Sequence, residues 1–250
     1  MLIGGMTQTL ASWGAQIRPL SERREVVAYE ARGQGMTELA LDDCTLPRHV
    51  EDFAALHEAL ALGGPVDLCG FSFGGRVALA IAAERPELVH RLVLSGVALD
   101  RGLVGRLIVR GWLAALATGN LEALARVSLP DILGPTYLEA NAALIEPMVR
   151  ASIERNRYDG VLALMRGTID LPEGSPWTAG PLAARIRAHG IAALCTGGAL
   201  DRLAPPDEVA ALADALVGEH VTIAGAGHTI AIETPQTWRD HALAFLDRDE

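Results

Sequence analysis

One serine in this chain has neighbours that suit nucleophilic chemistry. Ser72 lies in the run Gly70-Phe71-Ser72-Phe73-Gly74-Gly75, after a short apolar stretch at 66–69 and before an apolar pattern of helical period at 76–84. Glycines on both sides of a serine at a strand-to-helix junction are typical of a nucleophile elbow, a strained turn that lifts the hydroxyl out of the sheet. The start of the following helix favours negative charge. The sequence therefore predicts that Ser72 is a nucleophile.

A serine hydroxyl needs a base, commonly a histidine that is oriented by a carboxylate. Among the seven histidines, His228 is the candidate because it directly follows the last predicted strand. Catalytic groups of open α/β sheets gather at the carboxyl ends of strands. Asp201 follows the preceding strand in the same way and is the predicted acid. Asp100 is the alternative acid, since it follows the strand predicted at 92–94.

The serine motif alone also occurs in structural turns, so the prediction depends on the chain order Ser72, Asp201, His228. An oxyanion intermediate further needs hydrogen-bond donors. We expect these to be the backbone N–H of Phe73, directly after the nucleophile, and that of Met6, in the turn after the first short strand. Four residues are candidates for contact with the substrate: Gly5, Phe71, Arg76 and Trp177.

Short apolar strands and helices are predicted to alternate over most of the chain. Strand-like runs lie at 25–29, 65–69, 92–94, 191–196 and 221–224, and helical periods at 47–60, 76–84, 206–216 and 235–246. This alternation indicates an α/β fold with a mostly parallel sheet that helices cover on both faces.

The segment from 100 to 189 has a different character. Its strand-like runs disappear, and amphipathic helices are predicted at 103–117, 121–127, 137–155 and 160–168. We therefore expect a core formed by residues 1–99 and 190–250 and a helical lid formed by residues 100–189. The lid offers apolar side chains that would line a pocket or form the core of the lid: Trp112, Met148, Tyr158, Met165 and Trp177.

Composition excludes several classes of function. The net charge of -10 and the pI near 5.2 argue against binding to nucleic acid or to anionic membranes. The three cysteines have no spacing suited to zinc, so we expect buried thiols and no metal. No signal peptide or membrane span is apparent, which predicts a cytoplasmic protein that acts on a small molecule. The sequence does not predict the oligomeric state.

Four segments together resemble the α/β-hydrolase superfamily, specifically its lid-bearing serine esterases and C–C hydrolases: 26–35, 66–99, 191–205 and 224–235. The resemblance implies cleavage of a small carboxylic ester or thioester through an acyl-enzyme, with Ser72, His228 and Asp201 as the triad and no cofactor. Two features depart from the superfamily pattern. Gly4-Gly5 stands where His-Gly is usual, and the N-terminal β-hairpin is expected to be missing, which would make the strand at 25–29 an edge.

Two other functions remain open. Arg76 after Gly74-Gly75 is similar to an arginine in the synthase of menaquinone biosynthesis that eliminates pyruvate, so a cofactor-free lyase or a C–C bond hydrolase is the alternative. Ser72 and His228 would then act in proton abstraction. Four lid arginines are carboxylate ligands in that alternative, or else solvated helix charges: Arg150, Arg155, Arg157 and Arg166. A non-catalytic ligand-binding protein is the third possibility.

Overall fold

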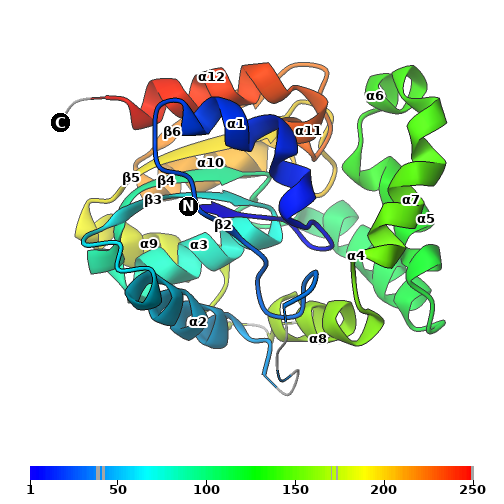
Figure 1. The fold of residues 1–250 in the computed structure, drawn as a ribbon, viewed down its shortest axis with the longest axis horizontal. Helices are drawn as coiled ribbons and strands as arrows, with labels where there is room; N and C mark the ends of the chain where they lie inside the picture. The colour runs from blue at the N-terminus through cyan, green and yellow to red at the C-terminus, as the bar shows by residue number, and fades with distance from the viewer. Residues whose placement is uncertain (38–39, 41–42, 170, 173, 249–250) are drawn as a thin grey trace.

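A parallel β-sheet forms the middle layer of the protein (Figure 1). The computed structural model describes residues 1–37, 40, 43–169, 171–172 and 174–248. These form a six-stranded sheet in the order β2-β1-β3-β4-β5-β6, in which every neighbouring pair is parallel. The strands are β1 (Leu2–Ile3), β2 (Ala28–Tyr29), β3 (Val66–Phe71), β4 (Val89–Ser95), β5 (Ala192–Gly198) and β6 (Glu219–Ile223). The predicted fold class is confirmed.

The central strands are buried on both faces. Leu68 of β3 pairs in register with Leu92 of β4, and both pack in the larger core cluster. Their neighbours Cys69 and Val93 pair in the same way but pack in the cluster on the opposite face. Because successive side chains point to opposite faces and both faces are covered, these strands are continuous apolar runs, which made them recognisable in the sequence.

Helices cover the two faces of the sheet. On one face lie α2 (Leu46–Ala59), α3 (Phe73–Glu84), α9 (Ala179–His189) and α10 (Pro206–Leu216), whose apolar side chains join the larger core. On the other face lie α1 (Gly14–Ser21), α11 (Ile230–Glu233) and α12 (Pro235–Leu246). Short 3-10 helices cover 10–13, 86–88 and 142–144. The result is the three-layer arrangement that the sequence predicted.

A second group of helices lies at one end of the sheet, drawn in green in Figure 1. It comprises α4 (Gly102–Leu116), α5 (Leu121–Ile132), α6 (Pro135–Ala140), α7 (Ile145–Glu154) and α8 (Tyr158–Thr168). Leu116, Leu124 and Met165 form a separate apolar cluster there. The lid was predicted to extend to residue 189, whereas α9 packs against α3 and α10 in the main core. The boundary at residue 189 therefore stays a prediction, and the packing of α9 favours a lid that ends before this helix.

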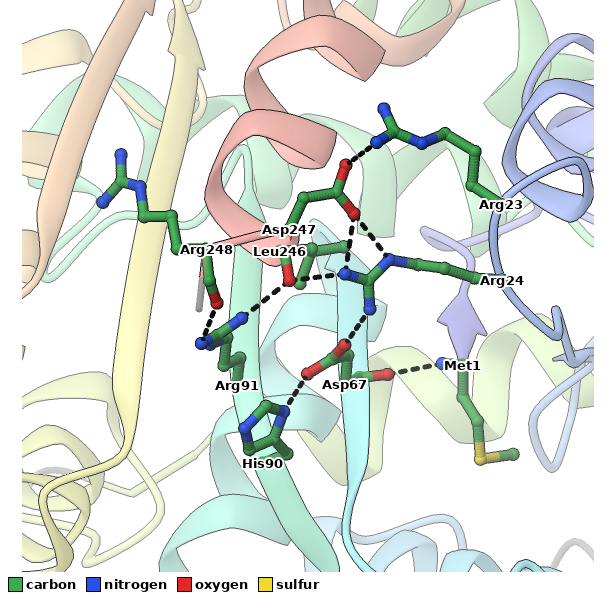
Figure 2. A network of polar contacts seen from close by, with 9 residues as sticks. All are labelled: Met1, Arg23, Arg24, Asp67, His90, Arg91, Leu246, Asp247 and Arg248. Atoms are coloured by element: carbon green, nitrogen blue, oxygen red, sulfur yellow. Dashed lines mark hydrogen bonds and ion pairs between the residues drawn. The ribbon is translucent and has the colours of Figure 1, made fainter. Parts of the chain in front are cut away.

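The amino ends of β3 and β4 carry a polar network that links them to the end of α12 (Figure 2). Asp67 accepts a hydrogen bond from Arg24 at 2.7 Å and lies 2.8 Å from Nδ1 of His90. Arg24 also contacts Asp247 at 2.8 Å, and Arg91 donates to the carbonyl of Leu246 at 2.6 Å. Ligand sites of open α/β sheets lie at the other, carboxyl, edge. We therefore assign this network to the joining of helix and sheet.

Candidate active site

The turn between β3 and α3 holds Ser72 in a strained conformation. Its φ of 50° and ψ of -111° lie outside the regions that residues with side chains ordinarily adopt. A Cβ atom on Gly70 would lie 2.6 Å from the carbonyl oxygen of Gly74, and one on Gly74 would lie 2.2 Å from that of Ile3. The glycines are therefore required by the close approach of neighbouring backbone, as the sequence predicted.

Replacing Gly74 by alanine is expected to lower the free energy of unfolding by about 3 kcal/mol, because its methyl group would force β1 and α3 apart. Urea unfolding measures this loss. Gly111→Ala is the matched control, since Gly111 lies within α4 and a Cβ there would meet no atom within 4 Å. That variant should be neutral or more stable by about 0.5–1 kcal/mol. Equal stability of Gly74→Ala and the wild type would contradict the expectation.

Three polar side chains from distant parts of the chain meet at the carboxyl edge of the sheet. His228 Nε2 lies 2.8 Å from Ser72 Oγ, and His228 Nδ1 lies 2.6 Å from Asp201 Oδ2. Both distances are within the range of good hydrogen bonds. One imidazole thus joins the hydroxyl and the carboxylate in a continuous chain.

The environment of Asp201 fixes the orientation of its carboxylate. Oδ1 accepts the backbone N–H groups of Leu203 at 2.8 Å and Ala204 at 2.9 Å, which leaves Oδ2 directed at the imidazole. The Asp201 side chain has no exposure to solvent, whereas that of Asp100 is 65% exposed and pairs with Arg106 at 2.9 Å. The structure thus brings Asp201, and not Asp100, against His228.

The imidazole of His228 fits a closely packed slot. The ring of Phe71 lies 5.0 Å from the imidazole, centroid to centroid. Gly96 also lies against the imidazole, and a Cβ atom there would come within 2.9 Å of the imidazole Cε1. A side chain at position 96 would push the imidazole away from Ser72. Glycine at this position therefore permits the hydrogen bond between His228 and Ser72.

Two cavities meet at Ser72. One has a volume of about 250 Å³ and the other of about 210 Å³, and four residues line both: Met6, Ser72, Trp112 and His228. The first cavity extends toward α3 and the start of α4, where Arg76 and Arg101 line it. The second is lined mainly by apolar side chains from α5, α7 and the end of α11, among them Leu129, Met148 and Ile232. A substrate that spans both cavities would pass directly over the serine.

The structure brings some of the predicted contact residues to these cavities and not others. Phe73 and Arg76 line the first cavity, and Phe71 lines the second. Trp177 is not among the described residues that line either cavity. It packs on the main core instead, and its ring lies 5.5 Å from the guanidinium of Arg185. Gly5 contributes to the turn that holds Met6, because its N–H donates to Gln8 at 2.8 Å.

Some of the lid residues considered in the sequence line a cavity next to Ser72, and others do not. Trp112, Met148 and Arg155 reach a cavity next to Ser72. Tyr158 and Met165 instead belong to the apolar cluster of the lid. Arg157 pairs with Asp159 at 2.9 Å on the surface of α8.

Comparison with known protein families decides the classification. The family model described as alpha/beta hydrolase fold matches residues 1–235. The chain belongs to the α/β-hydrolase family. The crystal structure of MGS-M2, an α/β-hydrolase enzyme from a Medee basin deep-sea metagenome library, superimposes with a TM-score of 0.85 at 22% sequence identity, over 100% of this chain and 89% of that one. This likeness supports the fold.

Curated relatives of this α/β hydrolase are distant. An uncharacterized protein of Mycobacterium bovis is 31% identical over 53% of this chain, and the match spans only 38% of that protein. Pyrrolizixenacetamide deacetylase of Xenorhabdus hominickii is 26% identical over 97% of this chain and 87% of its own length. Relatives that align along nearly the whole chain therefore include a deacetylase.

The described part of the chain holds no group of three or more histidine, cysteine, aspartate or glutamate side chains arranged to bind a metal ion. Cys69 and Cys195 are buried, and burial raises the pKa of their thiols to about 11 and about 12. Within the described residues, no helix combines the length and the apolar composition needed to span a membrane.

Glu233 supports the loop of His228 and was not among the residues predicted from the sequence. Its carboxylate accepts the N–H of Gly227 at 2.8 Å and that of Thr229 at 3.1 Å, the two residues that flank His228. It also accepts a hydrogen bond from the N–H of Gly134, directly before α6, at 2.9 Å. One carboxylate thus links the histidine loop to the lid. A glutamate five residues after a candidate histidine was the available signal.

Replacing Glu233 by alanine leaves three backbone N–H groups without their acceptor. Hydrogen bonds to a charged group contribute about 1.5–3 kcal/mol each, and water can replace part of what the half-buried Glu233 provides. We therefore expect the free energy of unfolding to fall by at least about 2 kcal/mol and kcat to fall roughly 10- to 100-fold. Urea unfolding and ester turnover measure these effects. Glu139→Ala, an exposed position on α6, is the control. An unchanged kcat in Glu233→Ala would contradict a positioning role.

Proposed function

We propose that this α/β hydrolase cleaves a small carboxylic ester or thioester through an acyl-enzyme on Ser72. The observation that carries the proposal is the hydrogen-bonded chain from Ser72 Oγ through His228 to Asp201, at 2.8 and 2.6 Å, where two cavities meet. The substrate is a small molecule with an acyl group, and the chemistry requires no cofactor. A cytoplasmic location remains part of the proposal.

In this mechanism His228 Nε2 accepts the proton of Ser72 as Oγ attacks the carbonyl carbon. Asp201 holds the proton on Nδ1 and stabilises the imidazolium that forms. His228 then donates its proton to the departing alcohol or thiol, which leaves the acyl group on Ser72. A water molecule, deprotonated by the same imidazole, attacks the acyl-enzyme, releases the acid and restores the serine hydroxyl.

The proposed oxyanion hole consists of the backbone N–H groups of Phe73 and Met6. Phe73 is the first residue of α3, where the helix dipole also favours negative charge. The turn that carries Met6 is fixed on both sides of Gly5. The Gly5 N–H donates to Gln8, and its carbonyl accepts Gln34 Nε2 at 2.6 Å. Because this turn is fixed, the Met6 N–H needs little reorganisation when the intermediate forms.

A second function has one specific observation in its favour. Arg76 lines the same cavity as Ser72 and His228, which suits the lyase that eliminates pyruvate or a C–C bond hydrolase acting on an acidic substrate. In the lyase His228 would take a proton from carbon through Ser72, and no acyl-enzyme would form.

Labelling with a fluorophosphonate tests the nucleophile directly. We expect the wild type to be labelled and Ser72→Ala to be silent, and absence of labelling in both would favour a non-catalytic binding protein. p-Nitrophenyl esters of graded acyl length then report turnover and the depth of the pocket. Turnover of these esters supports the hydrolase, whereas pyruvate release from a succinylated cyclohexene without ester turnover supports the lyase.

A further inference from the structure

The cavity of about 250 Å³ next to Ser72 is unusually rich in positive charge. Within the described residues, its lining includes the arginines Arg76, Arg101 and Arg106 and one carboxylate near the rim, Asp100. Asp100 pairs with Arg106 at 2.9 Å. The guanidinium groups of Arg76 and Arg101, by contrast, make no hydrogen bond or ion pair with the described part of the chain. Two half-buried guanidinium groups in one cavity thus have no direct partner among the described residues.

Partly buried guanidinium groups without a partner lower the stability of a folded protein. Burial, and secondarily the nearby charge of Arg101, lowers the pKa of Arg76 to about 9, and burial also lowers the pKa of Arg101. Elsewhere the partly buried Arg24 and Arg32 have carboxylate partners within 2.7 Å. A half-buried guanidinium that lacks a partner gains free energy when an anion enters the cavity. An anionic group of the substrate would therefore offset the free-energy cost of burying these two guanidinium groups.

The two cavities next to Ser72 differ in chemistry. Around Leu129, Met148 and Ile232 the second cavity is apolar, and its one arginine, Arg155, is exposed. Arg76 projects from the first turn of α3 and Arg101 directly precedes α4, so both cations belong to the first cavity alone. A substrate that extends through both cavities would meet positive charge on one side of the serine and apolar surface on the other.

We propose that Arg76 and Arg101 form a subsite for a carboxylate, so that the preferred ester carries a carboxylate in one half and an apolar group in the other. This inference rests on the proposed hydrolase function and names its substrate class. Guanidinium groups match carboxylates in a planar, two-bond geometry. A carboxylate is favoured over a doubly charged phosphate because Asp100 lines the same cavity and Asp201 lies close enough to interact with Arg101.

Matched pairs of esters test the subsite on either side of the scissile bond. Mono-ethyl succinate is compared with ethyl 4-methylpentanoate, in which an isopropyl group replaces the carboxylate. The butanoyl ester of glycolate is compared with isobutyl butanoate in the same way. We expect the wild type to prefer the anionic member of at least one pair in kcat/KM by roughly 10- to 100-fold, the value of a charge-assisted hydrogen bond. The pair that shows the preference identifies which half of the ester occupies the cavity.

Arg101→Gln should remove most of this preference, so that the ratio of kcat/KM for the anionic to the neutral ester falls roughly tenfold or more. Arg110→Gln is the matched control, because Arg110 is exposed on α4 and lies outside both cavities. Its ratio should equal that of the wild type. Equal kcat/KM values for both members of both pairs in the wild type, or an unchanged ratio in Arg101→Gln, would overturn the subsite.

Binding separates this inference from the proposed function. Calorimetry with succinate, and with succinamide as the neutral control, measures occupation of the cavity without any reaction. If the wild type turns over no ester but binds succinate and Arg101→Gln does not, the hydrolase proposal fails and the anion subsite stands. Ester turnover with no anionic preference and no succinate binding leaves the hydrolase and removes the subsite.

Discussion

Replacing Ser72 by alanine is expected to lower kcat for a simple ester by roughly 10⁴- to 10⁶-fold. The Ser72 hydroxyl lies 2.8 Å from His228 Nε2 and is the nucleophile of the proposed mechanism, and alanine has no group that can replace it. The residual rate would come from water attacking a carbonyl held near the oxyanion donors. Steady-state kinetics with a p-nitrophenyl ester measures the loss, and circular dichroism confirms that the variant is folded.

The loss in Ser72→Ala should not add to that in His228→Ala, because the two side chains act as a unit. The double variant is therefore expected to be no slower than either single variant. Ser21→Ala, an exposed position at the end of α1, is the control and should retain full activity. If Ser72→Ala kept more than about 1% of the wild-type kcat, the acyl-enzyme mechanism would be excluded.

Asp201→Asn is expected to lower kcat by roughly 10³- to 10⁴-fold, somewhat less than loss of the nucleophile. The reason lies in the two backbone N–H groups of Leu203 and Ala204, which require an oxygen at the Oδ1 position. The amide oxygen of asparagine would take that place, so its NH₂ group would face His228 Nδ1. The imidazole would then carry its proton on Nε2 and could no longer accept the proton of Ser72.

Asp100→Asn distinguishes this assignment from its alternative. Asp100 pairs with Arg106 and accepts the N–H of Gly102 at 3.1 Å, and its carboxylate does not contact the imidazole. We expect its kcat for a neutral ester to stay within about threefold of the wild type, since surface ion pairs contribute at most about 1 kcal/mol. A severe loss in Asp100→Asn together with a nearly silent Asp201→Asn would transfer the role of the acid to Asp100.

Local signals in the sequence were sufficient for the regular helices of the core. The helices predicted at 206–216 and 235–246 match α10 and α12, because a proline opens each and the apolar period continues to its end. α1 and α9 were not predicted. α1 is only eight residues long and contains Pro19, and α9 follows a proline-rich segment, so both depend on packing against the core rather than on propensity.

Strand ends and lid helices were predicted less accurately. The strand predicted at 25–29 is only Ala28–Tyr29, because only these residues pair with β1. The helix predicted at 137–155 is divided into α6 and α7 around Asn141, whose side chain donates to the carbonyl of Tyr137. Such interruptions come from side-chain hydrogen bonds that compete with the helix, and periodicity does not report them.

The sequence by itself determined the parallel sheet, the glycine-bounded turn at Ser72 and the two candidates that follow later strands, Asp201 and His228. These features are local: apolar runs, glycine positions and the fact that parallel strands end at the same edge. Only the tertiary structure decided that Asp201 rather than Asp100 contacts the imidazole, that Glu233 links its loop to the lid and that Arg76 and Arg101 share a cavity. These relations join residues far apart in the chain, and they depend on side-chain directions that packing sets and that no periodicity encodes.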